Sequence, residues 1–187
     1  MQHKYCAEDK EIILRPMEER DIERLRVWRN DENLTTYLSK IPYITPEKQL
    51  EWYRTYQKNP NTLFFAVVDK GKNLVIGTVA LYSFNGKSCE VGRILIGDST
   101  SHGKGIGYKS LILAMSVAID KLGITDFILN VHENNLAARK IYDRAGFLEY
   151  GKHDFPKGGI ELEMKINSEQ FYAKNPEAKT IKVYLED

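Results

Sequence analysis

Three glycines at alternate positions form a motif whose composition and spacing are typical of a ligand-binding loop. They are Gly103, Gly105 and Gly107; an apolar run ends at Ile96 before them, and a helical pattern begins at Leu111 after them. A glycine-rich turn that leaves a strand and opens a helix directs several backbone amides at one point, where the helix N-terminus adds partial positive charge. The stretch therefore predicts a phosphate or pyrophosphate site in an enzyme that uses a nucleotide cofactor. The alternative is a tight turn with no ligand.

Two common nucleotide-binding templates fail on spacing. A Walker A loop needs four residues between its first glycine and a Gly-Lys pair, followed by Ser or Thr. Here five residues separate Gly97 from Gly103-Lys104, and Gly105 follows the lysine. The dinucleotide fingerprint G-x-G-x-x-G fails as well, because these glycines read G-x-G-x-G and lie past the midpoint of the chain.

A second motif follows later in the chain. It reads Asn-Leu-Ala-Ala-Arg-Lys-Ile-Tyr from Asn135 to Tyr142 and closes on Gly146-Phe147. Together with the run His-Gly-Lys-Gly-Ile-Gly that begins at His102, it resembles the two signatures of the GNAT superfamily of N-acetyltransferases. His102 departs from the family, which has Arg or Gln at that place. Two motifs in the family's order are more specific than either alone, and the resemblance covers roughly residues 10–166.

The resemblance implies that acetyl-CoA is the co-substrate and that no metal is needed. In the family the loop cradles the pyrophosphate of acetyl-CoA through backbone amides, here those of Gly103, Lys104, Gly105, Ile106, Gly107 and Tyr108, with His102 at the head of the loop. The backbone of Ile94, Leu95 and Ile96 is expected to pair with the pantetheine arm like an added half-strand. Asn135 is expected both to cap its helix and to bond the same arm.

Two residues carry the expected chemistry of direct acetyl transfer in a ternary complex. In the family the tyrosine at the place of Tyr142 protonates the departing thiolate; from spacing alone it reads as a core aromatic. Glu90 is the candidate base, acting through water on the amine, or else an exposed strand carboxylate. Strand alternation predicts that Glu90 shares a face with Ile94 and Ile96. Cys89 is a weak candidate nucleophile because no histidine is paired with it in sequence.

The acceptor is expected to contact the first two helices and the loop between them. Trp28, Arg29, Tyr37 and Trp52 are the candidate substrate-binding residues, although Trp28 also suits a packed helix interface. This region resembles a family branch that acetylates the N-termini of ribosomal proteins and nucleotide-linked amino sugars, so a small-molecule or peptide amine is expected. Two other classes stay open: a non-catalytic acyl-CoA-binding module, and a structural partner that assembles through its last strand.

The elements that must position these residues follow from apolar periodicity, caps and turns. The expected strands are Ile12–Arg15, Leu63–Asp69, Leu74–Phe84, Ser88–Ile96, Asp126–His132 and, approximately, Phe147–Asp154 and Ile160–Ile166. The expected helices are Glu18–Asn30, Thr45 to about Lys58, Gly105–Leu122 and Asn135–Ala145. Residues 1–10 read as a polar leader. The alternating segment Thr180–Leu185 could join a sheet edge, in its own chain or a neighbour, or form a loose tail.

This order of elements predicts an α/β protein, and the resemblance narrows it to the GNAT fold. We expect a mixed, mainly antiparallel sheet flanked by helices, in which the fourth and fifth strands splay apart. One N-acetyltransferase domain is expected over residues 1–187, with its core at about 10–166 and a C-terminal extension at 167–187.

Composition sets the remaining bounds. The 187 residues carry a net charge of +1, and 42% are hydrophobic, which is ordinary for one globular domain. Such a balance favours neither a nucleic-acid nor a membrane partner. Cys6 and Cys89 form no metal or redox motif, so free thiols and a cytoplasmic location are expected. The four histidines show no ligand spacing, and a homodimer remains open.

Overall fold

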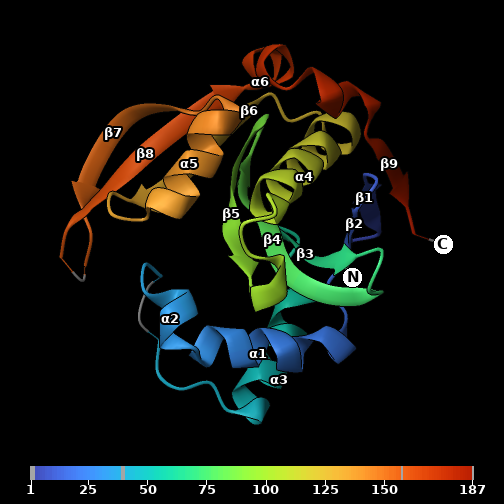
Figure 1. The fold of residues 1–187 in the computed structure, drawn as a ribbon, viewed down its shortest axis with the longest axis vertical. Helices are drawn as coiled ribbons and strands as arrows, with labels where there is room; N and C mark the ends of the chain where they lie inside the picture. The colour runs from blue at the N-terminus through green and yellow to red at the C-terminus, as the bar shows by residue number, and fades with distance from the viewer. Residues whose placement is uncertain (1–2, 39–40, 157, 187) are drawn as a thin grey trace.

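A single mixed sheet organises the molecule in the computed structural model, which describes residues 3–38, 41–156 and 158–186 (Figure 1). The described strands form one nine-stranded sheet in the order β7-β8-β6-β5-β4-β3-β2-β1-β9. They are β1 Tyr5–Glu8, β2 Ile12–Pro16, β3 Thr62–Asp69, β4 Leu74–Asn85, β5 Ser88–Ile96, β6 Asp126–His132, β7 Leu148–Asp154, β8 Ile160–Asn167 and β9 Lys182–Leu185. Every described pairing is antiparallel except that of β5 with β6. The predicted fold class is confirmed.

Helices cover both faces of the sheet. They are α1 Ile22–Asn30, α2 Glu32–Thr35, α3 Pro46–Tyr56, α4 Ile106–Leu122, α5 Leu136–Ala145 and α6 Ser168–Lys174, with 3-10 turns η1 Glu19–Asp21, η2 Ser99–Ser101 and η3 Pro176–Thr180. In Figure 1 the first three helices lie together at the bottom of the view, whereas α4 and α5 lie in its upper half, on either side of β5. A larger apolar core joins the sheet to α4 and α5, and a smaller one joins it to α1 and α3.

The helix boundaries follow from local chemistry that the sequence already displays. Thr45 caps α3, its side chain accepting from the Lys48 amide, and Pro46 occupies the first turn where its missing N–H costs nothing. Asn135 caps α5 in the same way through the Ala138 amide. Gly123 ends α4 with a left-handed φ of 65°.

The two ends of the chain meet at one edge of the sheet. Residues 5–8, read from the sequence as part of a polar leader, instead form β1, which pairs with β2. The C-terminal segment pairs with β1 through β9, so it joins a sheet edge of its own chain. Glu8 ties this corner together by ion pairs to Lys70 at 3.1 Å and Lys182 at 2.7 Å. The prediction of a polar leader was wrong. The few apolar residues of this segment become buried only when β1 lies between β2 and β9, and the local sequence does not show that pairing.

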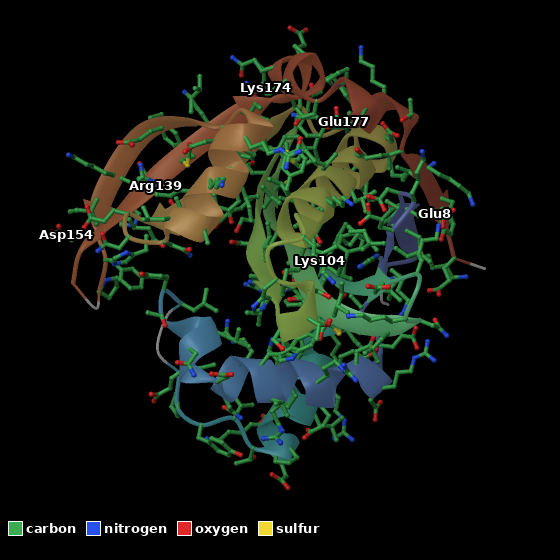
Figure 2. All side chains as sticks on the ribbon, in the orientation of Figure 1. Glu8, Lys104, Arg139, Asp154, Lys174 and Glu177 are labelled. Atoms are coloured by element: carbon green, nitrogen blue, oxygen red, sulfur yellow. The ribbon has the colours of Figure 1, made fainter. Side chains whose placement is uncertain are left out.

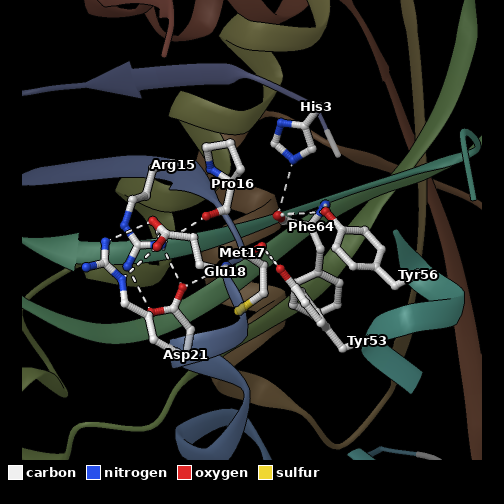
Figure 3. Close-up of polar contacts among 10 residues, drawn as sticks. His3, Arg15, Pro16, Met17, Glu18, Asp21, Tyr53, Tyr56 and Phe64 are labelled. Carbon is white, nitrogen blue, oxygen red and sulfur yellow. Dashed lines mark hydrogen bonds and ion pairs between the residues drawn. The ribbon is translucent and has the colours of Figure 1, made fainter. Parts of the chain in front are cut away.

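A network of polar contacts fixes the entrance to α1 (Figure 3). Arg15 donates to both carboxylate oxygens of Asp21, at 2.6 and 2.8 Å, and the Glu18 amide donates to the same carboxylate. Beside it, the Phe64 carbonyl accepts from His3 and from the hydroxyl of Tyr56. The first set of bonds ties the start of α1 to β2, and the bond from Tyr56 ties the end of α3 to β3. Together they place the two helices that carry the acceptor-side residues.

The parallel strands β5 and β6 pair only at their first residues. Ser88, Cys89 and Glu90 lie opposite Asp126, Phe127 and Ile128, after which the strands separate. This is the predicted splay of the fourth and fifth core strands, which are β5 and β6 here because β1 precedes them.

A β-bulge in β5 overturns the predicted strand alternation. Three steps along β5, from Gly92 to Leu95, match only two along β4, and Arg93 takes a left-handed φ of 52°. Beyond the bulge, Ile94 and Ile96 pack against the larger core, whereas Glu90 faces the other side and bonds Tyr82, which packs on the smaller core. Glu90 therefore does not share a face with Ile94 and Ile96.

Candidate functional site

The loop between β5 and α4 presents a run of free backbone amides. Within the described chain, the amides of residues 103 to 108 have no protein acceptor, while His102 N–H bonds Ser99 and Lys109 N–H returns to Gly105. Gly103 and Gly105 take φ of 74° and 75°, and a Cβ at either position would meet open space. The loop is exposed, and Lys104 on it is labelled in Figure 2. Such a run at a helix N-terminus fits a pyrophosphate, as expected from the sequence.

The third glycine of the motif serves helix packing as well. A Cβ on Gly107 would lie 2.8 Å from Ile141 Cδ1 of α5. The absence of a side chain at Gly107 therefore lets α5 approach α4 closely, which brings Tyr142 toward the wedge between β5 and β6.

A charged cluster near the surface anchors the start of the loop. Asp98 accepts from Lys72, Thr100 and Ser101, and these hydrogen bonds, led by that from Lys72, hold the pKa of the Asp98 carboxyl well below its usual range. The His102 ring donates from Nε2 to the Ile96 carbonyl at 2.7 Å. His102 thus pins the loop to the end of β5, a role that a ring at this place can fill without touching a phosphate.

Tyr142 is buried in the larger core, where neighbouring side chains fix the orientation of its ring. Its ring meets Phe147 edge-on at 5.9 Å, and burial raises the pKa of its phenol to about 12. Tyr82 is close enough that Tyr142 contributes to raising its pKa, after burial and the hydrogen bond to Glu90. The structure therefore brings both predicted catalytic residues, Tyr142 and Glu90, near the single side chain of Tyr82.

The side chains of two other predicted cofactor-binding residues, Asn135 and Tyr108, make hydrogen bonds that stabilise the fold. Asn135 caps α5 by its Oδ1. The Tyr108 hydroxyl donates to Asn175 Oδ1 at 2.6 Å and its ring lies under Arg144, so its side chain fastens α4 to the C-terminal extension. Only the backbone of Tyr108 is left for a ligand. Ile94, Leu95 and Ile96 lie just past the point where β5 leaves β6, where their backbone faces the wedge.

A cavity of about 610 Å³ opens on the other side of β5, between α1, α3 and the sheet. It is lined by Leu25, Arg29, Leu38, Ile41, Pro42, Ile44, Lys48, Gln49, Trp52, Phe64, Thr78, Arg93, Ile94 and Leu95. Because Ile94 and Leu95 border both this cavity and the wedge, an acceptor here would meet a thioester held along β5.

The four candidate substrate-binding residues do not lie in one site. Arg29 and Trp52 line the cavity. Trp28 is buried, and its ring lies so close to Gly97 that a Cβ there would clash; it belongs to the helix interface instead. The ring of Tyr37 lies tilted against that of His132, 5.2 Å between centres, at the end of β6, and does not line the cavity.

Several residues near the candidate site were not predicted as site residues from the sequence. Tyr82, Arg93 and Gln49 reach the site from β4, β5 and α3, and no motif marks them. Gln49 lies within the apolar stripe of α3, and a polar residue at a core-facing helix position is a signal that could have drawn attention to it. Arg93 could not be placed, because a strand pattern gives no sign of a bulge.

The described residues contain no cluster of His, Cys, Asp or Glu that could hold a metal. Both cysteines are buried free thiols, and burial raises the pKa of Cys89 to about 12, which leaves it a poor nucleophile at neutral pH. No helix among the described residues is long and apolar enough to cross a membrane.

Comparison with known proteins gives consistent matches. Residues 11–148 match the acetyltransferase (GNAT) domain family. An N-acetyltransferase 9-like protein of Nematostella vectensis is 23% identical over 172 residues, covering 86% of this chain and 85% of its own. Spermidine N(1)-acetyltransferase of Vibrio cholerae is 27% identical over 145 residues, covering 76% and 82%. The structure of a Vibrio cholerae spermidine N-acetyltransferase with CoA and spermine superposes with a TM-score of 0.78 at 24% identity, covering 87% of this chain and 99% of that one.

Proposed function

The chain belongs to the GNAT acetyltransferase family and is an acetyl-CoA-dependent N-acetyltransferase, and from that premise we propose how its residues carry out the transfer. The loop amides from Gly103 to Tyr108 bind the pyrophosphate, and the backbone of Ile94 to Ile96 aligns the pantetheine arm in the wedge between β5 and β6. The acceptor amine enters from the cavity on the other side of β5. The observation that carries this assignment is the run of amides without protein acceptors at the mouth of the wedge.

The amine must lose a proton before it attacks. A primary amine has a pKa near ~8–10 and is mostly charged at neutral pH. Glu90 is the proposed base, through a water molecule, because its carboxylate is half-buried beside the bulge and is oriented by Tyr82. The orientation matters, since proton acceptance works only within hydrogen-bonding reach.

The leaving thiolate needs a hydrogen-bond donor. Tyr142 keeps its proton at every working pH because its pKa is about 12. Full transfer of the Tyr142 proton to a thiolate of pKa ~8.5 is unfavourable by roughly 5 kcal/mol. Tyr142 therefore acts first as a hydrogen-bond donor that stabilises the negative charge developing on sulfur. The proton transfer is completed only as the thiolate leaves. Positioning of amine and thioester supplies most of the remaining acceleration.

The test is a release assay for free CoA thiol, run with acetyl-CoA and a panel of primary amines. Spermidine belongs in the panel because a relative is a spermidine N(1)-acetyltransferase, together with amino sugars, nucleotide-linked amino sugars and peptides with free N-termini. Thiol release that depends on an amine, with acetyl-CoA raising the melting temperature while NAD and ATP do not, is the expected result. An equal thermal shift with NAD would count against the assigned loop.

A further inference from the structure

The acceptor cavity carries positive charge that nothing in the described chain neutralises. Arg29 from α1 and Arg93 from β5 both line it. Neither guanidinium makes an ion pair or a hydrogen bond with any described residue, although the Arg93 backbone carbonyl accepts from Thr78. The Arg93 guanidinium lies over the ring of Tyr82, 4.5 Å from its centre. Elsewhere on α1, by contrast, Arg26 pairs with Glu23. The guanidinium groups of Arg29, which is half-buried, and of Arg93, which is exposed, thus both lack a carboxylate partner among the described residues, whereas Arg26 has one.

The two arginines also act on each other. Burial, followed by the positive charge of Arg93, lowers the pKa of Arg29. Like charges brought together in a partly desolvated site destabilise the empty cavity, and an anion between them would relieve that cost.

A buried amide in the same cavity lacks a partner. Gln49 of α3 is only 3% exposed and lines the cavity, and its Nε2 has no hydrogen-bond partner in the part of the chain that the structure describes. A buried donor without an acceptor is costly, so natural proteins rarely leave one unless a ligand or water supplies the oxygen.

The rest of the lining disfavours a second cationic group on the acceptor amine. Lys48 adds a third positive group, and no described Asp or Glu lines the cavity. The nearby carboxylate of Glu90 is engaged by Tyr82. Around these groups the walls are mostly apolar and include the aromatic residues Trp52 and Phe64. A polyamine would bring further positive charge into this field, whereas an anionic oxygen would meet only donors.

We infer that the acceptor is an amine that also bears an anionic oxygen group, a carboxylate or a phosphate, bound by Arg29, Arg93 and Gln49 while its apolar or ring portion lies on Trp52. This inference rests on the proposed function, because it takes the cavity as the acceptor site. It makes Arg29 and Arg93 specificity-determining residues and sets this chain apart from an enzyme for spermidine.

The test compares four six-carbon amines that differ only in their far end: hexylamine, hexanediamine, aminohexanoate and aminohexyl phosphate. Thiol release with acetyl-CoA gives kcat/KM for each. The better of the two anionic amines should exceed hexylamine by about ten- to a hundredfold, since hydrogen bonds to charged groups are the strong ones, and the diamine should be the poorest. The difference between carboxylate and phosphate identifies which group the site takes.

Variants link the selectivity to the named side chains. In Arg29→Met and Arg93→Met, the ratio of anionic to neutral amine should fall toward one, and Arg29→Lys should restore part of it. Arg24→Gln is the matched control, because Arg24 lies on the exposed side of the same helix and does not line the cavity. Its ratio should equal that of the wild type.

The outcomes separate this inference from the proposed function. Thiol release that is as fast with the diamine as with the anionic amines, or unchanged ratios in both arginine variants, would overturn the inference and leave the N-acetyltransferase assignment intact. If no amine in the panel is turned over, calorimetric titration of the same four compounds decides: tighter binding of an anionic amine than of the diamine supports the inference, and equal affinities refute it.

Discussion

The hydroxyl of Tyr82 donates a 2.7 Å hydrogen bond to Oε1 of Glu90, across the pairing of β4 with β5. The two residues are register partners, and the bulge at Arg93 follows directly beyond them. The bond explains how a strand carboxylate can be held at one orientation beside the wedge. It also makes Tyr82 a positioning residue for Glu90.

Tyr82→Phe should therefore reduce kcat by about tenfold, with acetyl-CoA affinity unchanged, because the carboxylate loses its orienting donor. Glu90→Gln should reduce kcat further, most at low pH where the amine most needs a base, and less as the pH approaches the amine pKa. Steady-state kinetics against pH measures both. The double variant should be no worse than Glu90→Gln alone; additive losses would mean that Tyr82 acts independently of Glu90.

Tyr142→Phe should lower kcat by ~10²–10⁴ while acetyl-CoA still binds, because the change removes the only donor proposed for the thiolate and keeps the buried ring. Single-turnover kinetics with isothermal titration of acetyl-CoA separates the two effects. Tyr150→Phe is the control, since Tyr150 is 48% exposed on β7 and should leave turnover unchanged. Wild-type turnover in Tyr142→Phe would reduce Tyr142 to a core aromatic.

Gly105→Val should abolish acetyl-CoA binding in a folded protein. Valine disfavours the φ of 75° that the loop requires, and its side chain would occupy the space in front of the free amides. Gly86→Val is the matched control, because Gly86 has a similar φ of 59°, equally open surroundings and no link to the loop. Both variants should lose about 1–2 kcal/mol of stability, yet only Gly105→Val should lose binding by calorimetry.

His3 should make stability depend on pH at the N-terminal edge. Burial lowers its pKa from 6.5 to about 4. Between these values the unfolded chain binds a proton that the folded chain does not, so stability falls as the pH drops from about 6.5 to about 4, by no more than about 3 kcal/mol. Urea unfolding at several pH values measures this loss. His3→Phe should flatten the dependence over that range, whereas His153→Gln, at an exposed position, should not.

Helices and strands with local signals can be predicted from the sequence alone. The capping residues Thr45 and Asn135 predict the starts of α3 and α5, and the helical spacing of apolar residues predicts α4. Both signals are local, because they depend on residues within one or two helical turns. The two glycine-bearing motifs, through their resemblance to a family, predict the fold class and the position of the cofactor loop from the sequence alone.

The arrangement around the bulge and at the sheet edge could not be predicted, because it depends on contacts between distant parts of the chain. The turn of Arg93 away from strand alternation, the pairing of β9 with β1, and the meeting of Arg29 with Arg93 in one cavity all join residues far apart in the chain. Pairing register and cavity lining arise from contacts between whole elements, whose free energy is shared among many residues. No local pattern records them, and for this reason the acceptor site emerged from the fold while the cofactor loop was visible in the sequence.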